Sequence, residues 1–134
     1  MVSIVRDVLA VILGGAIGTA LRLVIDLAIP HSDTSFPFST LAVNTVGAFT
    51  LAVLVARVWS RSPSWVRAGL GAGLLGSFTT FSAVAVAMVT LTLSGEWMLA
   101  LGFLMASILM GLGAAALGLR LGYGTRPPLD LVDE

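Results

Sequence analysis

The chain has 134 residues, of which 57% are hydrophobic and 10% are charged, and its formal net charge is zero. Soluble domains carry about 25% charged residues, so this composition excludes a water-soluble globule and indicates a membrane protein, with a mean hydropathy of +1.04. The zero net charge gives no indication of nucleic-acid binding, and the absence of cysteine excludes disulfides and thiolate chemistry.

Four apolar stretches occupy nearly the whole chain, and each has the roughly 20 residues that a membrane-spanning helix needs. We predict an all-α integral membrane protein with one four-helix domain, residues 1–134, and spans at residues 8–29, 38–58, 65–93 and 97–121. The polar tail at 122–134 is predicted to be disordered. The predicted span ends carry aromatic side chains that prefer the membrane–water interface, namely Trp59, Trp65, Trp97 and Tyr123.

The first span is too long for a signal peptide and is followed by three more apolar stretches. It also begins a pattern of glycine pairs one helical turn apart: Gly14 and Gly18, Gly69 and Gly73, Gly118 and Gly122. Small residues at this spacing let helix backbones approach closely. We therefore predict tight helix packing at these pairs. A seam for a second copy of the chain is the other use that the pattern allows.

The third span is unusually long and contains a cluster of glycines before the run Ser77-Phe78-Thr79-Thr80: Gly69, Gly71, Gly73 and Gly76. This composition predicts that the helix breaks here and exposes backbone carbonyls at membrane depth. Irregular backbone is tolerated in a membrane only where it is buried in protein or lines a site, and freed carbonyls coordinate hard cations well. A kink without a ligand is the alternative.

The spans contain no carboxylate or histidine apart from Asp26, which lies near the end of the first span. Proton relays and cation-driven antiporters usually need such a group. The spans do contain uncharged hydrogen-bond donors: Asn44, Thr45, Thr79, Thr80, Ser82 and Ser107. A track of donors suits an anion. The alternative is bonding between helices or back to the same helix, which we favour for Thr45.

The arginines are distributed unevenly between the two sides of the membrane. With four spans, both termini and the loop after the second span share one side, and that side holds six arginines: Arg6, Arg57, Arg61, Arg67, Arg120 and Arg126. Only Arg22 lies toward the other side. The positive-inside rule therefore predicts cytoplasmic termini.

Three segments together resemble the Fluc/CrcB family of fluoride ion channels. They read GGAIGTALR at 14–22, FSTLAVNTVGAF at 38–49 and GLLGSFTTFS at 73–82. Each alone is a weak signal, but their combination across three spans is specific. The resemblance implies a multi-pass, fluoride-specific channel of the bacterial inner membrane that exports fluoride from the cytoplasm. It also implies an antiparallel, dual-topology dimer of four-helix subunits with two pores, surrounded by membrane lipid.

The resemblance further implies roles for individual residues. An amide, a ring edge and two hydroxyls would line the pore: Asn44, Phe81, Ser82 and Ser107. An aromatic edge carries partial positive charge, so it can face an anion. Arg22 would lie near a vestibule and attract anions, with simple snorkelling toward the interface as the alternative. The backbone carbonyls of Gly76 and Thr79 would hold a structural Na⁺.

The chain departs from the family pattern directly after Ser82. The family continues with a threonine and then a second phenylalanine, where this chain has Ala83 and Val84. One hydroxyl and one ring edge are missing, so both pores of a homodimer are expected to be impaired. The one-sided arginines add a second departure, because an antiparallel homodimer needs a chain that inserts in both orientations. A heterodimer with an oppositely oriented paralogue and a homodimer both remain open.

Two other functions remain open from the sequence. A small multidrug-type transporter also has four helices, but it needs a central carboxylate in the first span, and Asp26 lies too close to the end. A non-conducting structural membrane subunit would tolerate the missing aromatic. An enzyme is not predicted, because the sequence offers no nucleophile–base set or metal cluster. His31 lies among turn formers and is expected to be solvated.

Overall fold

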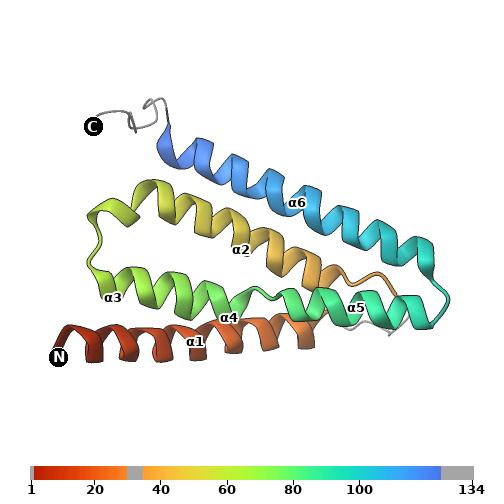
Figure 1. The fold of residues 1–134 in the computed structure, drawn as a ribbon, viewed down its shortest axis with the longest axis horizontal. Coiled ribbons are helices and arrows are strands. Elements are labelled where there is room, and N and C mark those ends of the chain that lie inside the picture. Colours follow the sequence, from red (N-terminus) through yellow and green to blue (C-terminus); the bar gives the residue numbers. More distant parts are fainter. Residues whose placement is uncertain (1, 30–34, 125–134) are drawn as a thin grey trace.

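The computed structural model describes residues 2–29 and 35–124, and these form helices joined by short connections (Figure 1). Four helical segments are long and apolar enough to cross a membrane: Ser3–Ala28, Phe38–Arg57, Ser64–Leu93 and Trp97–Tyr123. The predicted all-α membrane fold with four spans is confirmed. His31 and the part of the predicted polar tail from residue 125 onward lie outside the described residues.

The elements follow the predicted order, with some differences at their ends. Helix α1 (Val2–Ala28) begins six residues before the predicted start, and α2 (Phe38–Arg57) is followed by the short turn η1 (Trp59–Arg61). The third span consists of α3 (Ser64–Arg67), η2 (Ala68–Leu75), α4 (Gly76–Phe78) and α5 (Phe81–Leu93). Helix α6 (Trp97–Tyr123) extends two residues into the predicted tail.

The four spans pack mainly as two pairs. Helix α1 lies along η2 and α4, and α2 lies along α6, with few contacts between α1 and α2. In each pair the two segments run in the same direction, so α1 begins and α6 ends at one end of the molecule (Figure 1). Helix α5 continues past the break and packs against α6. The break in the third span therefore lies where the two pairs meet.

The predicted glycine packing is confirmed within this chain. A Cβ on Gly14 or Gly18 of α1 would collide with backbone carbonyls of the third span, and one on Gly73 would lie 2.8 Å from the carbonyl oxygen of Val11. In the other pair, a Cβ on Gly118 would lie 2.6 Å from the carbonyl oxygen of Phe49. The glycine pairs thus let the paired backbones touch. At each pair, the space beside the glycines is filled by a neighbouring helix of the same chain.

The predicted break in the third helix is confirmed, but it lies after the glycines. Residues Ala68–Leu75 form a π-helix, a wide turn that is often found at functional sites. The helix then ends at Phe78, because Thr79 (ψ 155°) and Thr80 (φ −156°, ψ 131°) have extended backbone. β-branched residues favour this conformation. Gly69 and Gly73 therefore serve the packing on α1, Gly71 lies against the ring of Trp59, and the threonines form the break.

Most large apolar side chains face outward, as expected of a chain whose solvent is lipid. The buried core is small and contains Leu41, Val84 and Phe103, with Phe36 and Met88 packed against it. Side chains such as Ile12, Leu27, Val86 and Leu112 are exposed along the outer faces. Fully satisfied helices with apolar exteriors are the form in which a chain can cross a bilayer.

Candidate functional site

The break is joined to α2 by one side chain, Asn44. Its amide nitrogen Nδ2 donates to the carbonyl oxygen of Thr80 at 3.0 Å, and its Oδ1 accepts from the Thr80 N–H at 2.8 Å. Both polar groups of one backbone residue are therefore satisfied by one amide. Unpaired backbone groups are costly in a membrane, so this pair of hydrogen bonds stabilises the extended backbone at the break.

Two threonine hydroxyls form further hydrogen bonds at the break. The Oγ1 of Thr79 donates to the carbonyl oxygen of Leu75 at 2.8 Å, one helical turn back. The Oγ1 of Thr80 accepts from the Ala83 N–H at 3.4 Å and lies 2.7 Å from the Oγ of Ser82. Thr80 is thus the N-cap of α5, a position that favours threonine.

These side-chain bonds release two backbone carbonyls. In an unbroken helix the Gly76 carbonyl would accept from the Thr80 N–H, which bonds to Asn44 instead. The Thr79 carbonyl would accept from the Ala83 N–H, which bonds to the Thr80 hydroxyl. Both carbonyls are left without their helical donors. Free carbonyl oxygens at a broken helix are the ligands that suit a hard monovalent cation.

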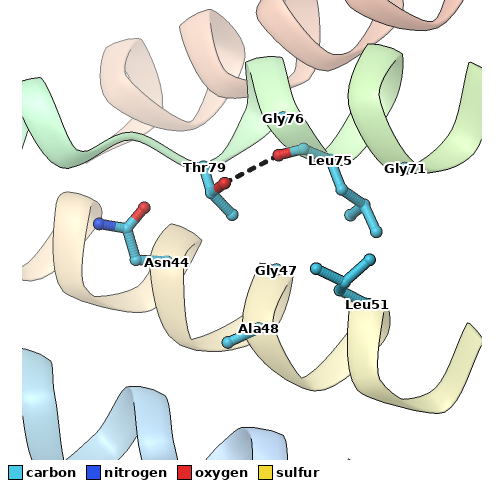
Figure 2. A pocket seen from close by; sticks show the side chains of 8 residues that line it. All are labelled: Asn44, Gly47, Ala48, Leu51, Gly71, Leu75, Gly76 and Thr79. Atoms are coloured by element: carbon cyan, nitrogen blue, oxygen red, sulfur yellow. Dashed lines mark hydrogen bonds between the residues drawn. The ribbon is translucent and has the colours of Figure 1, made fainter. Parts of the chain in front are cut away.

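A hollow of about 280 Å³ lies beside these carbonyls, between α2 and the third span (Figure 2). It is lined by small and apolar residues together with the polar groups of the break: Asn44, Gly47, Ala48, Leu51, Gly71, Leu75, Gly76 and Thr79. The helical segment that ends at Phe78 points its C-terminal end toward the break, and a helix C-terminus carries about half a negative charge. This side of the break favours a cation.

A second hollow, of about 300 Å³, lies on the other side of the break. Its lining comes from α2, the break, α5 and α6: Asn44, Thr79, Thr80, Phe81, Val84, Leu104, Ser107 and Ile108. Helix α5 begins at Phe81, so its free N–H groups and partial positive charge lie beside this hollow. The Oγ of Ser107 is buried and has no hydrogen-bond partner among the described residues. This side of the break favours an anion.

The chain was compared with protein families and known proteins. A family model described as "CrcB-like protein, Camphor Resistance (CrcB)" matches residues 9–119, which include every residue that lines the two hollows. The chain belongs to the CrcB-like family.

Several relatives of this CrcB-like chain carry descriptive names. It is 38% identical to the "Fluoride-specific ion channel FluC" of Paracoccus denitrificans, over 87% of this chain and 94% of that protein. It is 41% identical to "Fluoride-specific ion channel FluC 1" of Cutibacterium acnes, over 75% of this chain and 74% of that protein. It is 40% identical to the "Fluoride-specific ion channel FluC" of Parabacteroides distasonis, over 86% of this chain and 91% of that protein.

The CrcB-like chain brings most of the sequence-predicted site residues together. Asn44, Phe81 and Ser107 line the second hollow, and Gly76 and Thr79 line the first. Asn44 and Thr79 line both. Phe81 is 83% exposed, so it lies on the outer surface of the helix bundle. Ser82 is not among the residues that line either hollow, and its hydroxyl is hydrogen-bonded to that of Thr80.

Arg22 lies closer to the break than its place in the sequence indicates. Its Nη1 donates to the carbonyl oxygen of Phe78 at 3.4 Å, and its Nε lies 3.5 Å from Oδ2 of Asp26. The side chain is 17% exposed. It is therefore turned inward along α1 onto the end of α4, although six residues of α1 remain between it and the helix end.

The structure adds two residues whose roles the sequence reasoning missed. Thr80 caps α5, and a threonine directly before an apolar helical run is the signal that could have located this cap. Val84, at the position of the missing phenylalanine, is buried against Leu41 and the fully buried ring of Phe103. Nothing in the local sequence around Val84 indicates the contact with Phe103 from α6.

Proposed function

We propose that this chain is one subunit of a fluoride-conducting channel that lets fluoride leave the cytoplasm across the bacterial inner membrane. The observation that carries the proposal is the second hollow, whose lining brings together the N-terminus of α5, Asn44 and Ser107. The buried hydroxyl of Ser107 has no hydrogen-bond partner among the described residues. The names of the relatives, "Fluoride-specific ion channel", support the choice of ion.

The chemistry of the hollow suits a small halide. Fluoride is strongly hydrated, so a pathway must replace its water with close hydrogen-bond donors. Amide, hydroxyl and helix N-terminal N–H groups supply such donors, and the ring edge of Phe81 adds partial positive charge. No charged side chain is among the residues that line either hollow. Binding without a full countercharge allows an ion to leave as well as enter.

We infer that a structural Na⁺ is held by the carbonyls of Gly76 and Thr79. These two oxygens have lost their helical donors, and both residues line the first hollow, on the side of the break that favours a cation. Hard cations in proteins take about six oxygen ligands, and two carbonyls from one chain fall short of that number. A second subunit facing the break would add its own pair, and the bound ion would fix the two breaks against each other.

The dimer is proposed to be antiparallel, with an oppositely oriented partner that is either a second copy or a paralogue. The exposed Phe81 ring and the incomplete cation site both need a facing surface. Val84 leaves the subunit with one ring at the second hollow, which favours a paralogous partner that supplies the missing aromatic. The arginine distribution favours cytoplasmic termini and one orientation for this chain.

The test is fluoride efflux from liposomes that contain this chain alone, followed with a fluoride-selective electrode. Efflux of fluoride but not chloride supports the proposal and indicates self-pairing. If the chain alone passes no fluoride but conducts when an oppositely oriented paralogue is added, the proposal is supported and the channel is a heterodimer. Absence of fluoride efflux in both preparations would leave a non-conducting structural subunit.

A multidrug-type transporter has no support, because no carboxylate lines either hollow.

A further inference from the structure

Arg22 and Asp26 form a pair on α1 that reaches the third span 56 residues along the chain. The guanidinium uses two of its nitrogens in different directions. Nε faces the Asp26 carboxylate at 3.5 Å, and Nη1 donates to the Phe78 carbonyl at 3.4 Å. The side chain of Asp26 is 32% exposed and that of Arg22 is 17% exposed. The pair is thus partly shielded and directed at one backbone atom.

That backbone atom needs a donor. Phe78 is the last residue of α4, and in an unbroken helix its carbonyl would accept from the N–H of Ser82. The extended backbone at Thr79 and Thr80 removes that donor. The same carbonyl lies at the C-terminal end of a helical segment, where about half a negative charge accumulates. A cation placed there satisfies the carbonyl and offsets the charge.

We propose that Arg22 is a positioning residue of the ion pathway and that Asp26 orients it. Arg22 caps the C-terminal end of the broken helix through Phe78 and so holds the break in the geometry that Asn44 and Thr80 complete from the other side. Asp26 fixes the guanidinium in the rotamer that reaches Phe78. The expected effect on efflux rests on the proposed fluoride conduction. The contact between Arg22 and Phe78 can be tested independently of conduction.

The competing role is electrostatic attraction of anions by an arginine in a vestibule. The two roles make opposite predictions for Asp26→Ala. If Arg22 only attracts anions, removing the neighbouring negative charge leaves fluoride efflux unchanged or raises it. If Asp26 orients Arg22, the same change lowers efflux by about tenfold, the effect of losing a hydrogen bond to a charged group.

Arg22→Lys gives a second discriminating variant. Lysine keeps the positive charge but lacks the planar fork that bonds two groups at fixed angles. If Arg22 only attracts anions, this variant should show near-normal efflux. High salt should then weaken the effect of the positive charge on efflux, because salt screens the charge. Positioning predicts a loss of about tenfold that is insensitive to salt. The matched control for Asp26→Ala is Glu96→Gln, which removes an exposed carboxylate at the N-cap of α6 that is not one of the partners of the Arg22 guanidinium, Phe78 and Asp26.

The contact with Phe78 can be read directly by NMR. The sequence has two Phe–Thr peptide bonds, Phe49–Thr50 and Phe78–Thr79. Labelling with carbonyl-¹³C phenylalanine and ¹⁵N threonine therefore gives two correlations, of which Phe49–Thr50 is an internal reference. We expect Arg22→Lys and Asp26→Ala to shift the Phe78 carbonyl signal and leave the Phe49 signal in place.

The two readouts separate the possible failures. A Phe78 signal that is the same in wild type, Arg22→Lys and Asp26→Ala would overturn the positioning role, whatever the chain conducts. Unchanged or increased efflux in Asp26→Ala would also overturn it. If wild-type liposomes pass no fluoride with or without a paralogue, the proposed function fails, and the NMR shifts still decide whether Arg22 caps the break.

Discussion

Asn44 stabilises the break through two hydrogen bonds, because its amide satisfies both backbone polar groups of Thr80. Asn44→Asp keeps the shape and the acceptor for the Thr80 N–H, but it loses the donor and adds a negative charge to both hollows. We expect stability to fall by about 1–3 kcal/mol. We expect fluoride efflux to fall at least a hundredfold, because a like charge at close range costs about 4 kcal/mol in a partly screened site.

The neighbouring residue provides a matched control. The Oγ1 of Thr45 is buried on the same helix but has no hydrogen-bond partner among the described residues, so the predicted hydrogen bond of Thr45 between helices or back to its own helix is wrong. Thr45→Val removes an unsatisfied hydroxyl without changing shape, so stability should stay the same or rise by up to about 1 kcal/mol. Thermal unfolding in detergent and electrode-monitored efflux measure both variants. Wild-type efflux in Asn44→Asp would show that Asn44 does not face the ion.

Val84 tests whether the missing ring can simply be restored. The side chain is 8% exposed and packs against Leu41 and Phe103, and Phe103 is completely buried. Val84→Phe should therefore overpack the core and lower stability by about 1–3 kcal/mol. The double variant Val84→Phe with Phe103→Val exchanges the two side chains and restores the total volume, so it should recover much of this loss. Unfolding midpoints of the two variants check this, and equal stability of Val84→Phe and wild type would contradict it.

At the scale of the helices, the glycines divide into two classes with opposite expected effects. A Cβ on Gly18 would collide with the carbonyl of Leu74, whereas a Cβ on Gly113 of α6 meets nothing within 4 Å. Gly18→Ala should force α1 off the third span and cost about 1–3 kcal/mol or more. Gly113→Ala should be neutral or stabilise the isolated subunit by up to about 1 kcal/mol, because alanine favours the helix.

Unfolding of both alanine variants in detergent measures the difference. A Gly18→Ala variant as stable as Gly113→Ala would mean that α1 and the third span do not touch at their backbones. The comparison is matched, since the same methyl group is added to a helical glycine in each case.

The features that the sequence predicts well are those set by local composition. Four spans, the break after the glycine cluster and the small-residue packing follow from hydropathy and spacing within one helix. The contacts that define the site join distant segments: Asn44 to Thr80 over 36 residues, and Arg22 to Phe78 over 56. No local pattern encodes such a pairing. For that reason the donor set was predictable, whereas the inward turn of Arg22 and the burial of Val84 were not.

At the scale of the whole molecule, charge separates the two ends of the bundle. The end where α1 begins and α6 ends also carries the connection from α2 to α3 (Figure 1). Five described arginines belong to this end: Arg6, Arg57, Arg61, Arg67 and Arg120. Two of them have structural contacts: Arg57 donates to the carbonyl oxygen of Leu121 at 2.7 Å, and the guanidinium of Arg6 lies over the Trp65 ring, 5.8 Å from its centroid. The opposite end carries Glu96 and the shielded pair of Arg22 with Asp26.

This separation is expected to limit how the chain can pair with itself, because the positive-inside rule predicts that the positive end stays in the cytoplasm. We expect a C-terminal green fluorescent protein fusion of the wild type to fluoresce and a C-terminal alkaline phosphatase fusion to be inactive. A charge-balanced variant, with Arg61 and Arg120 changed to Gln and Ser94 and Glu96 changed to Lys, alters only exposed positions and spares Arg57.

The charge-balanced variant should populate both orientations, so that both reporters become active. If orientation is what limits self-pairing, this variant expressed alone should conduct more fluoride than the wild type expressed alone, because oppositely inserted copies now meet. A control that changes Arg61 and Arg120 to Lys keeps the bias and should match the wild type in both assays. Mixed orientation of the wild type would remove the orientation argument for a paralogous partner and leave Val84 as its remaining support.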